Sequence, residues 1–285
     1  MLSRRSAPGL LGVVHLPKSG GTAVRSALAA LDDVVAGPCY FDDFMFGGRR
    51  PSGLSDDQEA RITSPDHLRR MAEGRRLVMG HYQASTLVDA GCQRLAVQIR
   101  EPRARLLSLY RYWQLPEARA GWGSWEATAL AAADGSLTSF LAAPAAWPAA
   151  VDAVARQLLL SHRPLPAKPG ASATTRAVDG APFDQLLRRL AVVEWSNHAD
   201  RFVERVAQVI GSETVPTVGR ENETPTPTDV QRLDRASLET LSAMTAADSR
   251  LIGRLMADGL LERRSPGDLD DELAASAVRL GFQLA

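Results

Sequence analysis

Short apolar runs that alternate with helical patterns dominate the chain from residue 10 onward. Apolar runs at residues 10–16, 76–80 and 94–99 have the length of buried strands, and 34–35 and 191–193 add two shorter ones. Apolar positions at helical spacing, such as Val24, Ala27, Leu28 and Leu31, follow the first run. Strands that alternate with helices are typical of a parallel sheet covered on both sides. We therefore expect an α/β fold, with a central parallel β-sheet flanked by helices on both faces.

The second half of the chain is mostly helical in pattern. We expect a helix over residues 149–160, a helical region over 233–261 and an amphipathic helix over 268–284, so that residues 230–285 form a helical C-terminal region. Residues 163–182 are rich in Pro, Ala, Gly, Ser and Thr and show no periodicity, which predicts a flexible insert or a lid. The whole chain, residues 1–285, reads as a single domain.

Composition narrows the class of protein. With 285 residues, 45% of them hydrophobic, the chain can bury a sizeable core. Lys and Arg equal Asp and Glu at 33 each, so net charge gives no indication of a nucleic-acid partner. Cys39 and Cys92 form neither a disulfide framework nor a metal-ligand spacing, which favours a reducing, cytoplasmic compartment. We expect neither a signal peptide nor a transmembrane segment.

The stretch VVHLPKSGGT, residues 13–22, carries the strongest chemical signal. A strand that passes through a glycine turn into a helix aims backbone N–H groups and the helix N-terminus at an anion. Gly20 and Gly21 allow close approach to the backbone, Lys18 adds a cation and Thr22 a hydroxyl. The order differs from a Walker A loop, in which the lysine follows the glycines.

The strand at residues 94–99 leads into a second candidate site. Arg100 stands at its C-terminal end, where open α/β sheets bind ligands, and Ser108 follows about two helical turns later. A guanidinium can bind a phosphate with two hydrogen bonds, and a serine hydroxyl adds a neutral donor. We interpret Glu101, between them, as structural.

These two elements together resemble the sulfotransferases that use 3′-phosphoadenosine 5′-phosphosulfate (PAPS). The form HLPKSGGT is most similar to the carbohydrate, or type 2, branch, and REPRARLLSLY resembles that family's 3′-phosphate element. The segment 222–225, Asn-Glu-Thr-Pro, is similar to a later family loop. The resemblance implies a P-loop-like sheet with PAPS as sulfuryl donor and adenosine 3′,5′-bisphosphate as product. It implies these nucleotide-binding residues: Pro17, Lys18, Ser19, Gly20, Gly21, Thr22, Ala23, Arg100, Ser108 and Arg220.

Catalytic roles follow from the chemistry of sulfuryl transfer. We expect Lys18 to stabilise the charge on the leaving phosphate, because it stands in the anion loop. The acceptor hydroxyl needs a base. His81, in a Gly-His pair that resembles the uronyl 2-O-sulfotransferases, is the first candidate; Asp43, with Asp42 beside it, is the alternative. No histidine shows metal-ligand spacing, and we expect no metal.

The sequence therefore predicts a soluble, bacterial cytoplasmic PAPS-dependent sulfotransferase. Its acceptor would be a hydroxyl of a carbohydrate, a glycolipid or a small metabolite, and the sequence is compatible with a homodimer. Two alternatives stay open. A P-loop-like small-molecule kinase would need Mg²⁺ and ATP. A non-catalytic nucleotide-binding protein on the same fold would bind the nucleotide without turnover, because a binding loop does not establish chemistry.

Overall fold

The computed structural model describes most of the chain. Two predicted site residues, Asp43 and Arg220, lie outside the described part, as do residues 222–225 and the first half of the predicted insert, 163–171. The described residues are 9–31, 34–35, 41–42, 55–115, 135–144, 146–161, 172–219 and 229–284.

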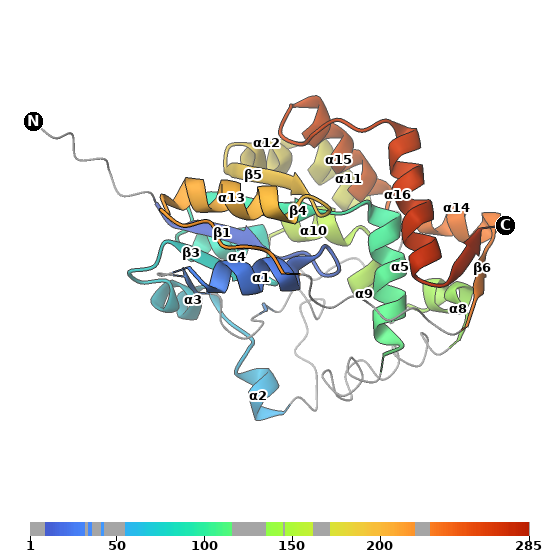
Figure 1. The fold of residues 1–285 in the computed structure, drawn as a ribbon, viewed down its shortest axis with the longest axis horizontal. Coiled ribbons are helices and arrows are strands. Elements are labelled where there is room, and N and C mark those ends of the chain that lie inside the picture. The colour runs from blue at the N-terminus through green and yellow to red at the C-terminus, as the bar shows by residue number, and fades with distance from the viewer. Residues whose placement is uncertain are drawn as a thin grey trace, which may run out of the picture.

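A parallel sheet of five strands forms the centre of the molecule, in the order β2-β3-β1-β4-β5 (Figure 1). All neighbouring strands in this sheet run parallel. The predicted fold class is therefore confirmed. The strands are β1 Leu11–Val14, β2 Val34–Val35, β3 Leu77–Gly80, β4 Arg94–Ile99 and β5 Leu190–Trp195.

Helices cover both faces of this sheet because alternate strand residues point to opposite sides. On one face, Val13 and Ala96 pack with α1 (Gly21–Ala29) and α13 (Ala199–Ile210). On the other face, Val97 belongs to a second apolar cluster. That cluster includes residues of α3 (Pro65–Met71), α4 (Ala84–Asp89), α10 (Ala153–Leu159), α11 (Ser172–Asp179), α12 (Ala181–Leu187) and α15 (Ala246–Ala257).

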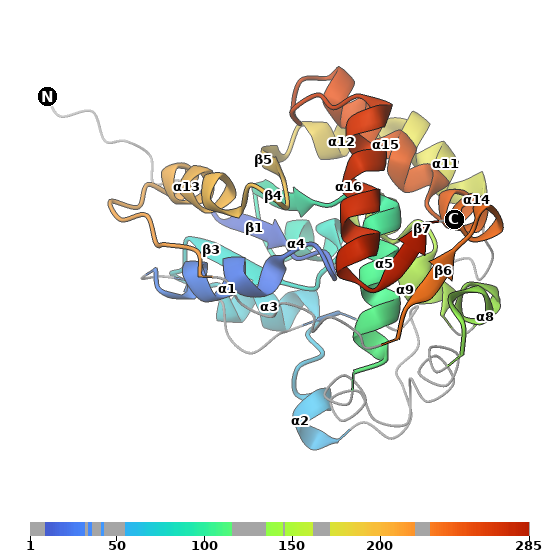
Figure 2. The ribbon, with the colours of Figure 1, turned by 45° about the vertical axis from the view of Figure 1, so that its right-hand side comes forward.

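A third apolar cluster lies beside the C-terminal ends of the strands. Its buried residues include Tyr110, Phe140, Leu241 and Phe282. Strands β6 and β7 form a separate parallel pair at this end of the molecule (Figure 2). The elements involved are α5 (Pro102–Trp113), α8 (Leu137–Ala142), α14 (Arg235–Met244), α16 (Pro266–Arg279), β6 (Gln231–Leu233) and β7 (Phe282–Leu284), and the short helices α2 (Asp56–Glu59) and α9 (Trp147–Ala150) complete the described fold.

Several predicted helices differ from the structure. The helix expected over 149–160 is interrupted at Asp152, which adopts a left-handed backbone with φ 44° and precedes α10. The region 233–261 divides into α14 and α15 at Thr245, and residues 230–285 also contain two strands. The second half of the predicted insert, 172–182, is helical: it forms α11 and the start of α12. Composition misled the prediction there, because these helices are stabilised by packing against α10 and α15.

None of the helices in the described ranges combines the length and the apolar character that a bilayer span requires.

Candidate functional site

The loop between β1 and α1 turns sharply at two left-handed residues. Lys18 has φ 66° and Gly20 has φ 77°. For a lysine this conformation is uncommon and costs about 1 kcal/mol or more, so the surrounding structure must hold it in place. Gly20 meets the same requirement without steric cost. The loop therefore contains two residues with a left-handed backbone. Helix α1 begins immediately after the second of them, at Gly21.

Gly21 allows a close contact between the loop and the residue below it. A Cβ atom added at Gly21 would lie 1.8 Å from Nε2 of His15, a buried ring. No larger residue fits there unless the ring moves. The predicted Gly-Gly pair thus serves two purposes: Gly20 supplies the left-handed turn, and Gly21 lets the start of α1 rest on His15.

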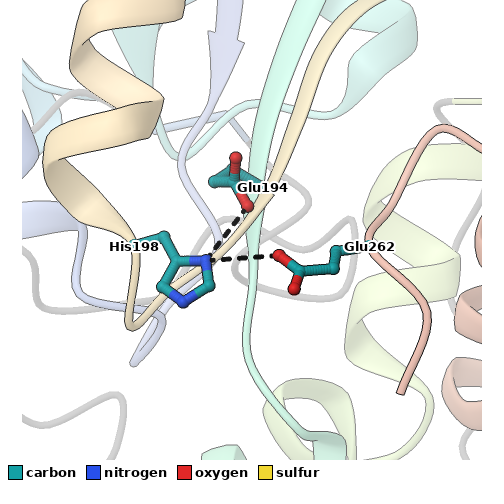
Figure 3. A group of neighbouring side chains, drawn as sticks. All are labelled: Glu194, His198 and Glu262. Carbon is teal, nitrogen blue, oxygen red and sulfur yellow. Dashed lines mark ion pairs between the residues drawn. The ribbon is translucent and has the colours of Figure 1, made fainter.

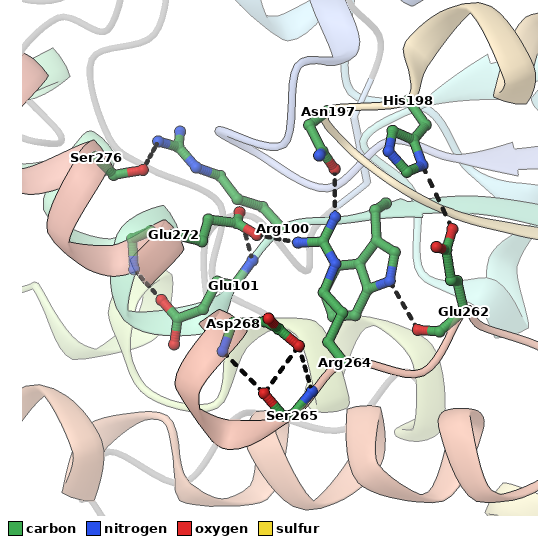
Figure 4. A network of polar contacts seen from close by, with 12 residues as sticks. Arg100, Glu101, Asn197, His198, Glu262, Arg264, Ser265, Asp268, Glu272 and Ser276 are labelled. Atoms are coloured by element: carbon green, nitrogen blue, oxygen red, sulfur yellow. Dashed lines mark hydrogen bonds and ion pairs between the residues drawn. The ribbon is translucent and has the colours of Figure 1, made fainter. Parts of the chain in front are cut away.

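Three cations meet beside this loop. Arg100, at the end of β4, donates from Nη1 to the backbone oxygen of Lys18 at 3.3 Å and from Nη2 to Oγ of Ser276 at 3.1 Å (Figure 4). Arg279 donates to the same Oγ at 3.2 Å. The ammonium of Lys18 lies 4.1 Å from the centre of the Tyr112 ring. The loop, the end of β4 and α16 thus bring their positive charges to one place.

These cations form no close ion pair in the described part of the chain, although the more distant carboxylates of Glu272 and Glu101 act on Arg100. No ion pair within 4.0 Å joins Lys18, Arg100 or Arg279 to any described carboxylate. Burial, followed by the charge of Arg100, lowers the pKa of Lys18 to about 8. Burial, followed by the charge of Arg279, lowers the pKa of Arg100 to about 10. Mutual repulsion of this kind is relieved when an anion binds.

An open cavity of about 770 Å³ lies next to the cations. Its wall includes Gly20 of the loop, Arg100 and Arg279, and it continues past Asn197 to Arg264. The wall also carries four acidic residues, Glu262, Asp268, Asp271 and Glu272. Arg264 is held by a hydrogen bond to Asn197 Oδ1 (2.8 Å) and an ion pair with Glu272 (Figure 4). A cavity at the C-terminal ends of parallel strands is the usual ligand site of open α/β sheets.

His81 and His15 form a stacked pair at the ends of β3 and β1. Their ring centres are 4.0 Å apart with an angle of 22° between the planes. Nδ1 of His81 lies 2.8 Å from the backbone oxygen of His15. Because that oxygen can only accept, Nδ1 carries the proton in the neutral ring and Nε2 carries the lone pair. Burial, followed by His81, lowers the pKa of His15 well below its ordinary value.

Asp42, the neighbour of the candidate base Asp43, has a structural position. Its buried Oδ2 accepts hydrogen bonds from the backbone N–H of Gln83 (2.7 Å) and from Oγ1 of Thr86 (2.6 Å), at the start of α4. Glu101 is also structural, as predicted. It accepts from the backbone N–H of Ala104 at the start of α5 and pairs with Arg103 at 2.6 Å.

Glu194, His198 and Glu262 gather near the cavity (Figure 3). One possible metal-ligand atom from each lies within 4.8 Å of the others. However, Arg201 bridges the two glutamates at 3.1 and 3.2 Å, and Arg205 lies 3.5 Å from Glu194. The arginines balance the carboxylates, so we interpret this group as an ion-pair cluster that joins the end of β5 to the segment before α16.

The structure brings together some predicted residues and separates others. The loop residues Pro17 to Ala23 and Arg100 border the same region, at the end of β1 and β4. Ser108 is 3% exposed on α5 and does not line the cavity, so its contact with nucleotide stays a prediction. The hydroxyl beside Arg100 belongs instead to Ser276. Sequence analysis missed Ser276, Arg279 and Tyr112, because nothing in the amphipathic pattern of α16 or α5 marks which residue faces the loop.

Comparison with known proteins gives one structural match. No family model matches the chain, and no curated protein matches it. The crystal structure of a sulfotransferase from Alicyclobacillus acidocaldarius matches over 93% of this chain and 100% of its own, with a TM-score of 0.49 and 16% sequence identity.

Proposed function

We propose that this protein is a PAPS-dependent sulfotransferase that transfers a sulfuryl group to a hydroxyl of a carbohydrate, a glycolipid or a small metabolite. One observation carries the proposal: Lys18, Arg100 and Arg279 gather beside a helix-initiating glycine loop, and none of them forms an ion pair within 4.0 Å with a described carboxylate. A ligand with two separated phosphate-type groups would give these cations direct anionic partners. The proposal includes the predicted location of the protein, which is the cytoplasm.

The loop has the features that a 5′-phosphosulfate needs. Backbone N–H groups from Gly20 to Thr22 begin α1, where the helix dipole favours an anion. Gly20 has no side chain, and it borders the cavity. Lys18 stands at the turn. PAPS supplies an activated sulfuryl group whose leaving phosphate gains negative charge, and the ammonium of Lys18 would stabilise that charge.

Arg100, Ser276 and Arg279 suit the 3′-phosphate. The two guanidinium groups share one hydroxyl at 3.1 and 3.2 Å, so a phosphate beside Ser276 could accept hydrogen bonds from both. This arrangement also supports adenosine 3′,5′-bisphosphate over ADP or ATP, in which no phosphate stands on the 3′ side. The proposal therefore adds two residues of α16 to the predicted nucleotide ligands.

His81 is the proposed base for the acceptor hydroxyl. Nδ1–H of His81 donates to the backbone oxygen of His15, so Nε2 is the basic nitrogen of the neutral ring. The stacked ring of His15 fixes the plane of His81. We therefore expect His81→Asn to keep nucleotide affinity and to lower kcat by about 100-fold or more, which is the range of general base catalysis.

Calorimetric titration tests the donor. We expect adenosine 3′,5′-bisphosphate to bind without Mg²⁺ and more tightly than AMP, ADP or ATP. Arg100→Ala and Arg279→Ala should each weaken binding by about 10- to 100-fold, the value of a hydrogen bond to a charged group. Arg235→Ala is the matched control, because Arg235 is exposed on α14 and pairs only with Glu239 in the described chain.

Other outcomes would replace the proposal. Preference for ATP with Mg²⁺ would favour a small-molecule kinase and overturn sulfuryl transfer. Tight binding of the bisphosphate without turnover on any hydroxyl acceptor, together with no effect of His81→Asn, would favour a non-catalytic nucleotide-binding protein.

A further inference from the structure

A row of polar side chains crosses the sheet directly beneath the anion loop. Val13 pairs with Met79 of β3 and with Ala96 of β4, so two residues further on His15 is level with His81 and Gln98. These polar side chains point to the same face of the sheet as Val13, Met79 and Ala96, which pack against α1 and α13. His15 and Gln98 therefore lie side by side on a face that is otherwise apolar, below Ser19.

The polar atoms of these residues are buried and unsatisfied. His15 is 7% exposed, Ser19 1% and Gln98 5%. Nδ1 of His15, Oγ of Ser19 and both Oε1 and Nε2 of Gln98 have no hydrogen-bond partner among the residues that the structure describes. An orphaned buried polar atom costs about 1–3 kcal/mol, and such atoms in native proteins are normally satisfied.

All three residues line one small cavity. The remaining wall is apolar and includes Val24, Met79 and Phe202. The volume open to the centre of a water molecule is about 10 Å³. One water needs about 10–15 Å³ by this measure, together with two to four polar partners. The cavity thus matches a single water in size and in polar lining.

We propose that one water molecule occupies this cavity, hydrogen-bonded to Ser19, Gln98 and His15, and holds the anion loop from beneath. Gln98 offers an acceptor and a donor, and Ser19 can act as either. The surroundings disfavour a cation, because burial and then His81, Arg25 and Lys18 all lower the pKa of His15.

The proposal changes the role of Ser19. Its hydroxyl points to the water below and not to a nucleotide above, so Ser19 is a positioning residue that fixes the loop between Lys18 and Gly20. This consequence rests on the proposed nucleotide site, whereas the presence of the water does not.

A crystal structure of the full chain at about 1.5 Å resolution, without nucleotide, is the direct test. We expect one density peak within hydrogen-bond distance of Ser19 Oγ and the Gln98 amide, about 2.6–3.2 Å. An empty cavity, or side chains rearranged to bond one another, would overturn the water. Anomalous signal at the peak after a rubidium soak would mean a monovalent cation and would also overturn it.

Gln98→Met tests the effect on the loop, because it keeps the side chain's length and removes both polar atoms. We expect the water to be lost and the Kd for adenosine 3′,5′-bisphosphate to rise about 5-fold, as for one hydrogen bond. Thr174→Val removes a buried hydroxyl of α11 that has no hydrogen-bond partner among the described residues. It is the matched control and should leave the Kd unchanged.

Unchanged affinity in Gln98→Met would overturn the role in positioning, even if the water is seen. If the variant fails to fold, Ser19→Ala is measured in its place, with the same expected rise. Failure of the wild-type protein to bind any nucleotide would overturn the proposed function, while the density peak would still decide the water.

Discussion

Two groups of arginine and lysine side chains lie close to the sheet, and they differ in what balances their charge. In the first, which we call the helix-capping cluster, Arg105 and Arg156 are 1% exposed and lie near the carboxylates of Asp152 and Asp248. In the second, the open cation cluster, Arg100 and Arg279 line a cavity whose wall also carries acidic side chains, and Lys18 lies in the loop beside Arg100. None of these three cations forms an ion pair within 4.0 Å with a carboxylate of the described chain.

The carboxylates of the helix-capping cluster also join two helices. Oδ1 of Asp152 accepts from the backbone N–H of Ala247 at 2.8 Å, at the start of α15. Oδ1 of Asp248 accepts from the N–H of Ala155 at 2.7 Å, at the start of α10. Each aspartate thus caps the other helix, and the arginines offset the buried negative charge.

The comparison indicates how a structural cluster can be told from a binding site. Opposite charges that are buried near one another need no ligand, and removing one of them is costly because the other is left alone in the core. Charges held together without a counter-ion raise the energy of the empty site, which a bound anion then lowers. The first cluster should therefore respond to mutation in stability, and the second in binding and turnover.

The largest expected effect is on stability, in Asp248→Ala. The change leaves Arg105 and Arg156 with one carboxylate fewer in the core and removes the cap from α10. At pH 8, where the carboxyl of Asp248 is mostly ionised, we expect the free energy of unfolding in urea to fall by about 3–5 kcal/mol, the cost of leaving a buried charge without its counter-charge. Asp270→Ala, an exposed partner of Arg103, is the control and should cost no more than about 1 kcal/mol. Equal losses in both variants would contradict the comparison.

In the open cation cluster, Lys18→Ala should lower the rate of turnover and leave stability unchanged. We expect kcat for sulfuryl transfer to fall by about 100-fold or more, because the developing charge on the leaving phosphate loses its cation. Stability in urea should not decrease, since no carboxylate loses its partner. A variant that unfolds more easily yet still turns over normally would show that Lys18 is structural.

The affinity for adenosine 3′,5′-bisphosphate should depend on pH through Lys18. Its pKa in the protein is lowered to about 8, so the ammonium loses its proton as the pH rises through that value. We expect Kd to rise above pH 8 by up to about tenfold per pH unit. Calorimetry between pH 7 and 9.5 measures this. Lys18→Arg keeps its charge and should give a flatter profile; identical profiles would mean that another group titrates.

A smaller effect concerns the pH dependence of stability. Burial raises the pKa of Asp248 from 3.8 to about 7. The folded state therefore holds this proton more tightly than the unfolded state does. Its contribution to stability is fully present below pH 4 and is lost as the pH rises through about 7. Asp248→Asn should remove that component, which is at most about 1.4 kcal/mol per pH unit, in urea titrations from pH 4.5 to 7.5. Parallel curves for the two proteins would refute the assignment.

Local patterns predicted much of the fold. The strands at 10–16, 76–80 and 94–99 appear as β1, β3 and β4 within a few residues, because short apolar runs next to turns have few other buried arrangements. The start of α5 was also predicted, since Glu101 caps it and Pro102 fits its first position.

Helix boundaries that depend on partners far along the chain were predicted wrongly. Asp152 interrupts the helix expected over 149–160 because its side chain caps α15, almost a hundred residues later. Helix α11 was missed because its Ala, Ser and Thr composition is typical of a loop, and packing against α10 and α15 stabilises it.

The sequence by itself located the glycine loop after β1, with Lys18, and Arg100 at the end of β4, because a turn after a strand is encoded by a few consecutive residues. Only the tertiary structure decided that Ser276 and Arg279 complete the cation cluster. It also placed Gln98 and Ser19 on one small cavity below the loop. These side chains come from elements far apart in the chain, and their meeting depends on strand register and on the packing of α16, which no local pattern encodes.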